Sequence, residues 1–110
     1  MRIVVNLRVE GFHQWVGAPA PHSYLASMHR HEFHVRAEKL VTHADRDIEI
    51  IAFKRELVEF IEAKYGRPAM LGGKSCEMLA LEFVRAFQLD LCEVLEDGEN
   101  GAVVYGGEGQ

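Results

Sequence analysis

The sequence is poor in cysteine and has no long apolar run. Its two cysteines, Cys76 and Cys92, do not form a CxxC motif and lie in apolar segments, which favours two buried thiols in a reducing compartment over a disulfide. The first eight residues lack the apolar run of a signal peptide. Nothing in the chain approaches the roughly 20 apolar residues of a membrane span. We therefore expect a cytoplasmic protein without a membrane partner.

Basic residues are outnumbered by acidic ones. The chain has 12 lysines and arginines against 17 aspartates and glutamates, a net charge of -5. Nucleic-acid binding needs clustered lysine and arginine, so this balance argues against nucleic acid as a partner. A length of 110 residues, 48% of them hydrophobic, predicts one domain spanning residues 1–110 with a core of its own.

Two segments near the N-terminus alternate between apolar and polar residues. In residues 2–13 the odd positions are apolar or small and end with Gly11 and His13, which predicts a strand with one buried face. Residues 29–41 alternate in the same way and predict a second strand. The residues between them, 14–28, contain two prolines and a glycine and are expected to form a long irregular loop.

The remainder of the chain changes to helical periodicity and then returns to strands. Ser75 can cap the second helix, and the DG and NG pairs in DGENG favour a hairpin turn between the last two strands. The order ββααββ predicts an α+β domain in which two helices cover one face of a four-stranded antiparallel sheet. The expected short extended run, two helices and two strands are residues 48–51, 53–65, 75–87, 91–96 and 102–105.

Three histidines fall within the segment HRHEFHV, residues 29–35. Side chains two apart on a strand share a face, with Cβ atoms roughly 6–7 Å apart, so His29 and His31 can converge on one ion. His13 ends the apolar face of the preceding strand, and an antiparallel pairing would bring it to the same surface. His34 has the opposite parity and is excluded from the group.

Three imidazoles with an open position are a common arrangement of catalytic zinc, and all-nitrogen ligation suits that metal. The alternative is that each histidine is a hydrogen-bonded core residue. Burying three imidazoles without a shared cation would be costly unless each found its own partners. We therefore expect His13, His29 and His31 to bind one zinc ion.

Four motifs follow one another along nearly the whole chain: GFHQW at residues 11–15, HRHEF at 29–33, SCEM at 75–78 and the hairpin LEDGENG at 95–101. Together they resemble the 6-pyruvoyl-tetrahydropterin synthase and 6-carboxy-tetrahydropterin synthase family, which has the tunnelling fold. The first motif resembles the family's segment with one zinc histidine, and the second its HGHNY motif with the other two. The third stands where the family begins its second helix with Thr/Ser-Thr/Ser-Glu-Asn.

The resemblance implies a zinc-dependent carbon–oxygen lyase acting on dihydroneopterin triphosphate, or on another pterin or purine-derived ligand. It assigns substrate binding to Ser75, Cys76, Glu77 and Glu96, of which Glu96 is the anchoring glutamate. A carboxylate there could accept two N–H groups from the edge of the ring. Without the resemblance, Glu96 would be an exposed hairpin residue. The family also implies a homo-oligomer, a hexamer built as a dimer of trimers, with ligand sites at subunit boundaries.

The proton-transfer residues of the family are not matched. Residues 14–28 contain no cysteine, aspartate or glutamate, which leaves His22 as the expected catalytic base. The segment 67–74 lacks the family's Asp/His pair, and Ala52 stands where an aspartate is common. Two functions therefore stay open: the lyase, and a catalytically inactive protein that senses or sequesters a pterin or nucleotide-like ligand. A structural oligomer without a small-molecule role is a third alternative.

Overall fold

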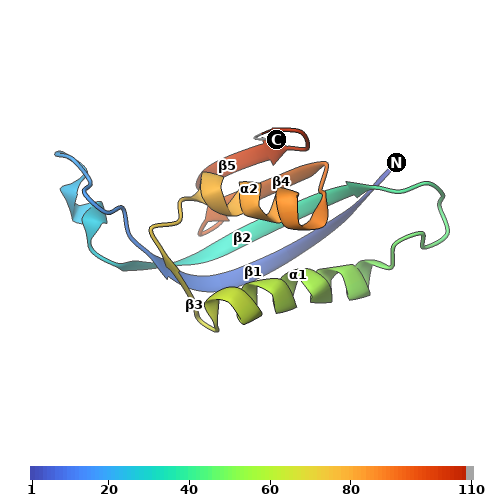
Figure 1. Ribbon diagram of the computed structural model, residues 1–110, viewed down its shortest axis with the longest axis horizontal. Helices are drawn as coiled ribbons and strands as arrows, with labels where there is room; N and C mark the ends of the chain where they lie inside the picture. Colours follow the sequence, from blue (N-terminus) through green and yellow to red (C-terminus); the bar gives the residue numbers. More distant parts are fainter. Residues whose placement is uncertain (109–110) are drawn as a thin grey trace.

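The structure is a computed structural model that describes residues 1–108. It has two layers, a five-stranded sheet and two helices that pack on one of its faces (Figure 1). The predicted α+β class is therefore confirmed. Along the chain the elements are β1 (Arg2–His13), the 3-10 helix η1 (Ser23–Ala26), β2 (His29–Leu40), α1 (Ile50–Tyr65), β3 (Ala69–Gly72), α2 (Cys76–Phe87), β4 (Leu91–Glu96) and β5 (Asn100–Tyr105).

β1 and β2 form a long antiparallel hairpin, as the alternation predicts. The register ends with His13 opposite His29, and it places Gly11 opposite His31. Because residues two apart on a strand share a face, this register gathers the three histidines at one end of the sheet.

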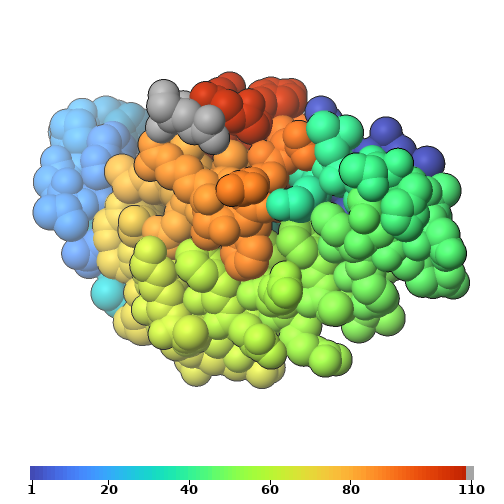
Figure 2. Space-filling view, turned by 45° about the vertical axis from the view of Figure 1, so that its right-hand side comes forward, coloured from blue at the N-terminus to red at the C-terminus, as the bar shows by residue number. Residues whose placement is uncertain are grey.

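The segment between β1 and β2 extends past that end of the sheet. It forms the light-blue part at the left of Figures 1 and 2. The backbone N–H of Trp15 donates to the carbonyl of Leu25 at 2.8 Å, which folds the segment back on itself. Apart from η1 it is irregular, as expected from its prolines.

A fifth strand corrects the predicted sheet. β3 runs parallel to β1 beside residues Gly11 to His13, so the sheet is mixed and has the order β3-β1-β2-β4-β5. It is not the four-stranded antiparallel sheet that the sequence predicts. Four residues are too few to show a period, and only Ala69 and Leu71 of β3 are buried in the core.

α1 begins at Ile50, so the extended run predicted at residues 48–51 is wrong. The cause is a helix cap: the carboxylate of Glu49 accepts a hydrogen bond from the backbone N–H of Ala52 at 2.6 Å. The helix ends at Tyr65, as predicted, and Gly66 caps it with a φ of 86°, which suits a residue without a side chain.

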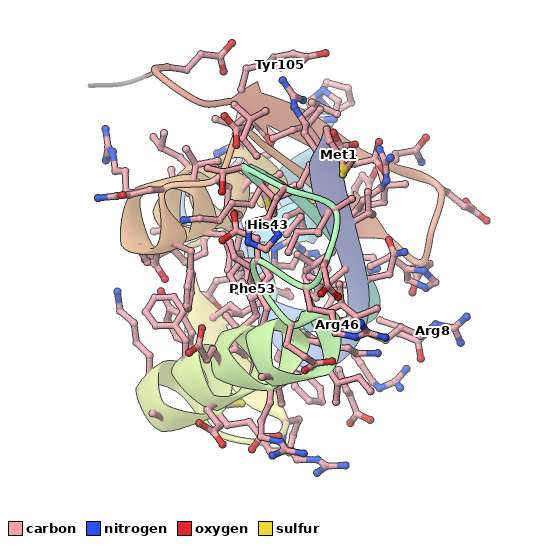
Figure 3. The ribbon with its side chains drawn as sticks, turned by 90° about the vertical axis from the view of Figure 1, so that its right-hand side faces the viewer. Met1, Arg8, His43, Arg46, Phe53 and Tyr105 are labelled. Carbon is pink, nitrogen blue, oxygen red and sulfur yellow. The ribbon has the colours of Figure 1, made fainter. Side chains whose placement is uncertain are left out.

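α2 begins after Ser75, whose Oγ accepts a hydrogen bond from the backbone N–H of Met78 at 3.1 Å. Both helices bury their apolar sides against the same face of the sheet. Figure 3 shows Phe53 between α1 and the sheet, whereas Arg8 projects from the face that the helices leave open.

Among the described residues, no helix is long and apolar enough to cross a membrane. The largest fully buried side chains are Phe33, Phe83, Leu57, Val35, Val84, Val94 and Cys92.

β4 and β5 form the predicted hairpin, although β5 begins two residues early, at Asn100. The turn passes through Asp97 and Gly98, both with positive φ (56° and 72°), which is the conformation that an Asp-Gly pair favours. β4 pairs with β2, and its last residue, Glu96, lies opposite Phe33. The hairpin turn is thereby brought to the histidine end of the sheet.

Candidate metal centre

Three histidines converge at the end of the β1–β2 hairpin. His13, His29 and His31 each offer one ring nitrogen, and these atoms all lie within 4.8 Å of one another. The ring centroids are 4.5, 5.0 and 5.3 Å apart, with the rings close to perpendicular. This group could hold a metal ion. His34 lies outside it, with Nε2 3.0 Å from a carboxylate oxygen of Glu32.

Each of the three rings is held through its Nδ1 atom. Nδ1 of His13 lies 2.8 Å from the carbonyl oxygen of Lys74, and Nδ1 of His29 lies 2.9 Å from that of Ser27. Nδ1 of His31 lies 2.7 Å from Oδ2 of Asp97. A carbonyl or carboxylate oxygen only accepts, so this assigns the proton to Nδ1 and leaves the Nε2 lone pair for a metal. Metal-binding histidines are commonly oriented in this way.

The nitrogen of His13 that faces the group has no hydrogen-bond partner. Its side chain is buried, and Nε2 is out of contact with solvent. Oε2 of Glu96 lies 3.0 Å away, but the pair does not meet the angular requirement of a hydrogen bond. A buried nitrogen without a partner is costly, and a bound cation would remove that cost. The residues present therefore fit a metal ion.

Asp97 is a site residue that the sequence analysis misses. Its Oδ1 accepts the backbone N–H of Glu32 at 2.9 Å while its Oδ2 holds His31. These contacts, the backbone hydrogen bond first, hold the pKa of the Asp97 carboxyl below its ordinary value. The sequence signal that could have found Asp97 is its place in the Asp-Gly turn directly after β4, which the structure brings to the histidine end of the sheet.

The carbonyl that holds His13 belongs to a residue anchored on α2. Nζ of Lys74 lies 3.3 Å from Oε2 of Glu82, and Nζ of Lys64 lies 3.0 Å from the same oxygen. The Tyr65 hydroxyl donates to Oε1 of Glu82 at 2.6 Å. Burial alone would raise the pKa of Glu82, but the hydrogen bonds from Tyr65, Lys64 and Lys74 outweigh it and the net shift is downward. The two helices thus fix the backbone that orients His13.

A cavity of about 500 Å³ adjoins the histidines. His13 and His29 form one side of it, and the exposed Trp15 lies at its rim. All four residues predicted to bind a substrate lie on its wall, three of them at the start of α2. The wall consists of His13, Gln14, Trp15, Leu25, His29, Gly73, Lys74, Ser75, Cys76, Glu77, Met78, Glu96, Asn100 and Gly101.

Cys76 is the thiol on the cavity wall. Burial, with smaller contributions from the charges of Glu96 and Glu77, raises the pKa of Cys76 to about 12. A thiol held protonated in this way is a poor nucleophile and a poor base. Cys76 therefore suits packing against a ligand better than chemistry on it.

His22, the predicted base, stacks on Trp15. Their ring centroids are 5.8 Å apart and the rings are inclined by 30°. The cavity wall includes Trp15 but not His22. Its catalytic role stays a prediction, and it would require the segment that carries it to fold further over the cavity.

A larger cavity, of about 580 Å³, lies elsewhere, between β1 and α1. Its wall carries charges of both signs, including Arg8, Glu10, Glu62 and Arg67, and no histidine. By volume alone, this larger cavity would be the preferred candidate for a ligand site. The smaller cavity is the better candidate because the unpartnered nitrogen of His13 and the start of a helix converge there.

No protein-family model matches the sequence, and no curated protein matches it as a relative. What the site binds therefore has to be inferred from its donors and its cavity.

Proposed function

We propose that the chain is a zinc-binding protein of the 6-pyruvoyl-tetrahydropterin synthase type, which takes up a pterin or a related purine-derived ligand in the cavity beside His13 and His29. The observation that carries this proposal is the buried Nε2 of His13, which has no hydrogen-bond partner and faces two further imidazoles. Zinc is the ion that three neutral imidazoles suit best. When bound, zinc acts as a Lewis acid that polarises oxygen atoms of a ligand.

The cavity wall offers the groups that a flat nitrogen heterocycle needs. Trp15 is half exposed and presents an aromatic surface for stacking. Glu96 and Asn100 supply acceptors and donors from the hairpin. The first turn of α2 adds backbone N–H groups at Cys76 and Glu77 that are free of helical partners, together with the positive end of the helix dipole.

A lyase acting on dihydroneopterin triphosphate is the second candidate, favoured by the presence of His13 and His29 on the wall of the ligand cavity. Such a reaction needs a proton carrier beside the ligand. Cys76 is held protonated, and His22 stacks on Trp15 outside the wall. Binding without efficient turnover is therefore the better-supported function, and turnover of this substrate is expected to be weak or absent.

The hexameric tunnelling-fold assembly belongs to the same proposal. Two features support it. β3 covers only the end of β1, at Gly11 to His13, which leaves the described remainder of that edge free to pair with another strand. Val4 and Val103 are both 39% exposed although they are apolar. Light scattering after size exclusion tests the assembly: a mass near the single chain's 12.4 kDa would contradict it.

Ligand binding can be followed through Trp15, because it is the only tryptophan in the sequence. Neopterin, with guanosine as a purine probe, is titrated into the zinc-saturated protein while fluorescence and heat are recorded. Stacking on Trp15 should quench its emission. In calorimetry, Trp15→Ala should weaken binding by about 1–3 kcal/mol, the usual contribution of one aromatic stack.

The matched control is Tyr24→Ala, which removes an exposed aromatic residue from the same segment but not from the cavity wall. It should bind both probes like the wild type. Absence of heat and of quenching with both probes, in protein that does hold zinc, would contradict the proposed ligand class.

A further inference from the structure

Glu96 makes its ion-pair contacts with the histidine group. Its Oε2 lies 3.0 Å from Nε2 of His13, and its Oε1 lies 3.7 Å from Nε2 of His31. Both nitrogens are the ones left without a proton when Nδ1 is held by Lys74 and by Asp97. The carboxylate therefore faces two bare lone pairs.

We propose that Glu96 is a fourth ligand of the ion in the protein without a heterocycle, an inference that rests on the metal binding proposed above. Donor atoms about 2.0–2.1 Å from a tetrahedral zinc ion lie roughly 3.3–3.4 Å from one another. The separations of 3.0 and 3.7 Å from His13 and His31 fall on either side of that value. The carboxylate thus already stands at ligand spacing from two members of the group.

A direct hydrogen bond does not account for this contact. The Nδ1 of His13 already donates to a carbonyl, so the neutral ring has only a lone pair at Nε2. Two acceptors at 3.0 Å repel each other unless a cation lies between them. The oxygen also lies off the direction that a hydrogen bond from Nε2 would need. A metal ion on the lone-pair axis of the nitrogen accepts both atoms as ligands.

Charge leads to the same conclusion. Among the described residues, no lysine or arginine pairs with Glu96, whose side chain is 31% exposed. A carboxylate at the edge of a cavity without a basic partner is stabilised by a nearby cation. A divalent ion held by three neutral imidazoles would supply that cation, and the carboxylate would reduce its net charge from +2 to +1.

The assignment gives Glu96 two roles that exclude each other. A carboxylate that ligates the ion is not available to accept N–H groups from a heterocycle. Four protein ligands also leave no open position on a tetrahedral ion, which is the pattern of a closed site. Uptake of a heterocycle would therefore have to release Glu96 and open the metal at the same time.

The test uses the full chain with Zn²⁺ and Co²⁺ alone as probes. Zinc affinity is measured by competition with a coloured chelator, and ligand number by the visible absorption of the Co²⁺ form. Glu96→Gln is compared with Glu93→Gln, a control on the same strand that lies opposite Arg36. His13→Ala removes an imidazole ligand and reports on the metal site itself. Circular dichroism establishes that each variant folds.

Glu96→Gln should weaken zinc binding at least about 10-fold and change the Co²⁺ bands, whereas Glu93→Gln should alter neither. Weaker zinc binding with wild-type Co²⁺ bands would make Glu96 a neighbouring charge and overturn the inference. Unchanged affinity would overturn it as well. If His13→Ala still loses zinc in that case, the proposed metal site survives. Absence of zinc uptake by the wild-type chain would contradict both the proposed metal site and the assignment of Glu96 as a ligand.

Discussion

Asp97 accepts a hydrogen bond from Nδ1 of His31 at 2.7 Å and thereby ties the β4–β5 turn to the histidine group. The other two rings are held in the same manner by carbonyls from different segments, those of Ser27 and Lys74. The β1–β2 loop, the residue before the start of α2 and the β4–β5 turn thus set the directions of the three Nε2 atoms. Metal affinity should consequently depend on these partners as well as on the three histidines.

Replacing Asp97 by asparagine should weaken zinc binding about 10–100-fold, the range usual for partners of metal-binding histidines. Asparagine tolerates the positive φ of this position, so the turn should persist. Its oxygen can still accept from the backbone N–H of Glu32, but its NH₂ group would then face the proton on Nδ1 of His31. The ring must rotate or change tautomer, and either change misdirects Nε2. Competition with a coloured chelator measures the loss.

Glu99→Gln is the control, because it removes an acidic side chain from the same turn, and among the described residues no hydrogen bond or ion pair joins that side chain to a histidine. It should leave zinc affinity unchanged. Equal affinities for Asp97→Asn and the wild type would mean that the turn does not orient His31.

Removal of the metal should lower thermal stability. An ion that binds only the folded state stabilises it by about 2.7 kcal/mol when present at 100 times its dissociation constant. A chelator should therefore lower the melting temperature, and added zinc should restore it. His13→Ala should abolish the zinc response, whereas His34→Ala should retain it because His34 contacts Glu32 outside the group. A melting temperature indifferent to zinc would contradict metal binding at this site.

Glu82→Gln should destabilise the metal-free protein by about 1–2 kcal/mol near neutral pH, since it removes a charged acceptor shared by Tyr65 and two lysines. The folded-state pKa of Glu82 is lowered, so its contribution is complete above the ordinary glutamate pKa of about 4.3. It is lost as the pH falls through the lowered value.

The stability difference between wild type and Glu82→Gln should therefore shrink as the pH falls below the ordinary glutamate pKa of about 4.3 and through the lowered value, measured by urea unfolding with a chelator present. The chelator excludes the separate effect of protonating the histidines on metal binding. A difference that stays constant over this range would show that the charge of Glu82 is not what stabilises the network.

Neopterin should change the visible spectrum of the Co²⁺-loaded wild type if the heterocycle releases Glu96 from the ion. In Co²⁺-loaded Glu96→Gln, where that ligand is already missing, the same addition should produce a much smaller change. The measurement is made at saturating Co²⁺ so that occupancy does not differ between the two proteins. Identical changes in both would argue that the heterocycle acts on the ion without moving Glu96.

Strand parity is the part of the site that the sequence could reveal. Residues 2–13 and 29–40 alternate cleanly, and alternation decides which side chains share a face. It therefore predicts that His29 and His31 point the same way and that His34 does not. Grouping them with His13 needed only the assumption of an antiparallel hairpin, which the register confirms.

The partners of the rings could not be read from the sequence in the same way. The carbonyl of Lys74 and the carboxylate of Asp97 reach the histidines only through contacts between distant segments. Strand β3 could not be predicted for a related reason, because its four residues pair with β1 and are too few to show a periodicity of their own. Glu49 caps α1 from outside the apolar stripe, so periodicity alone starts that helix too late.

His13 and His29 form the last pair of the β1–β2 hairpin, and residues 14–28 lie between them along the chain. An ion bound to both would act as a cross-link at the base of that loop, much as a disulfide would. Such a link removes conformations from the unfolded chain and limits how far the loop can open in the folded one. Cleavage of residues 14–28 by a protease would then slow as zinc is bound, reporting occupancy through the backbone.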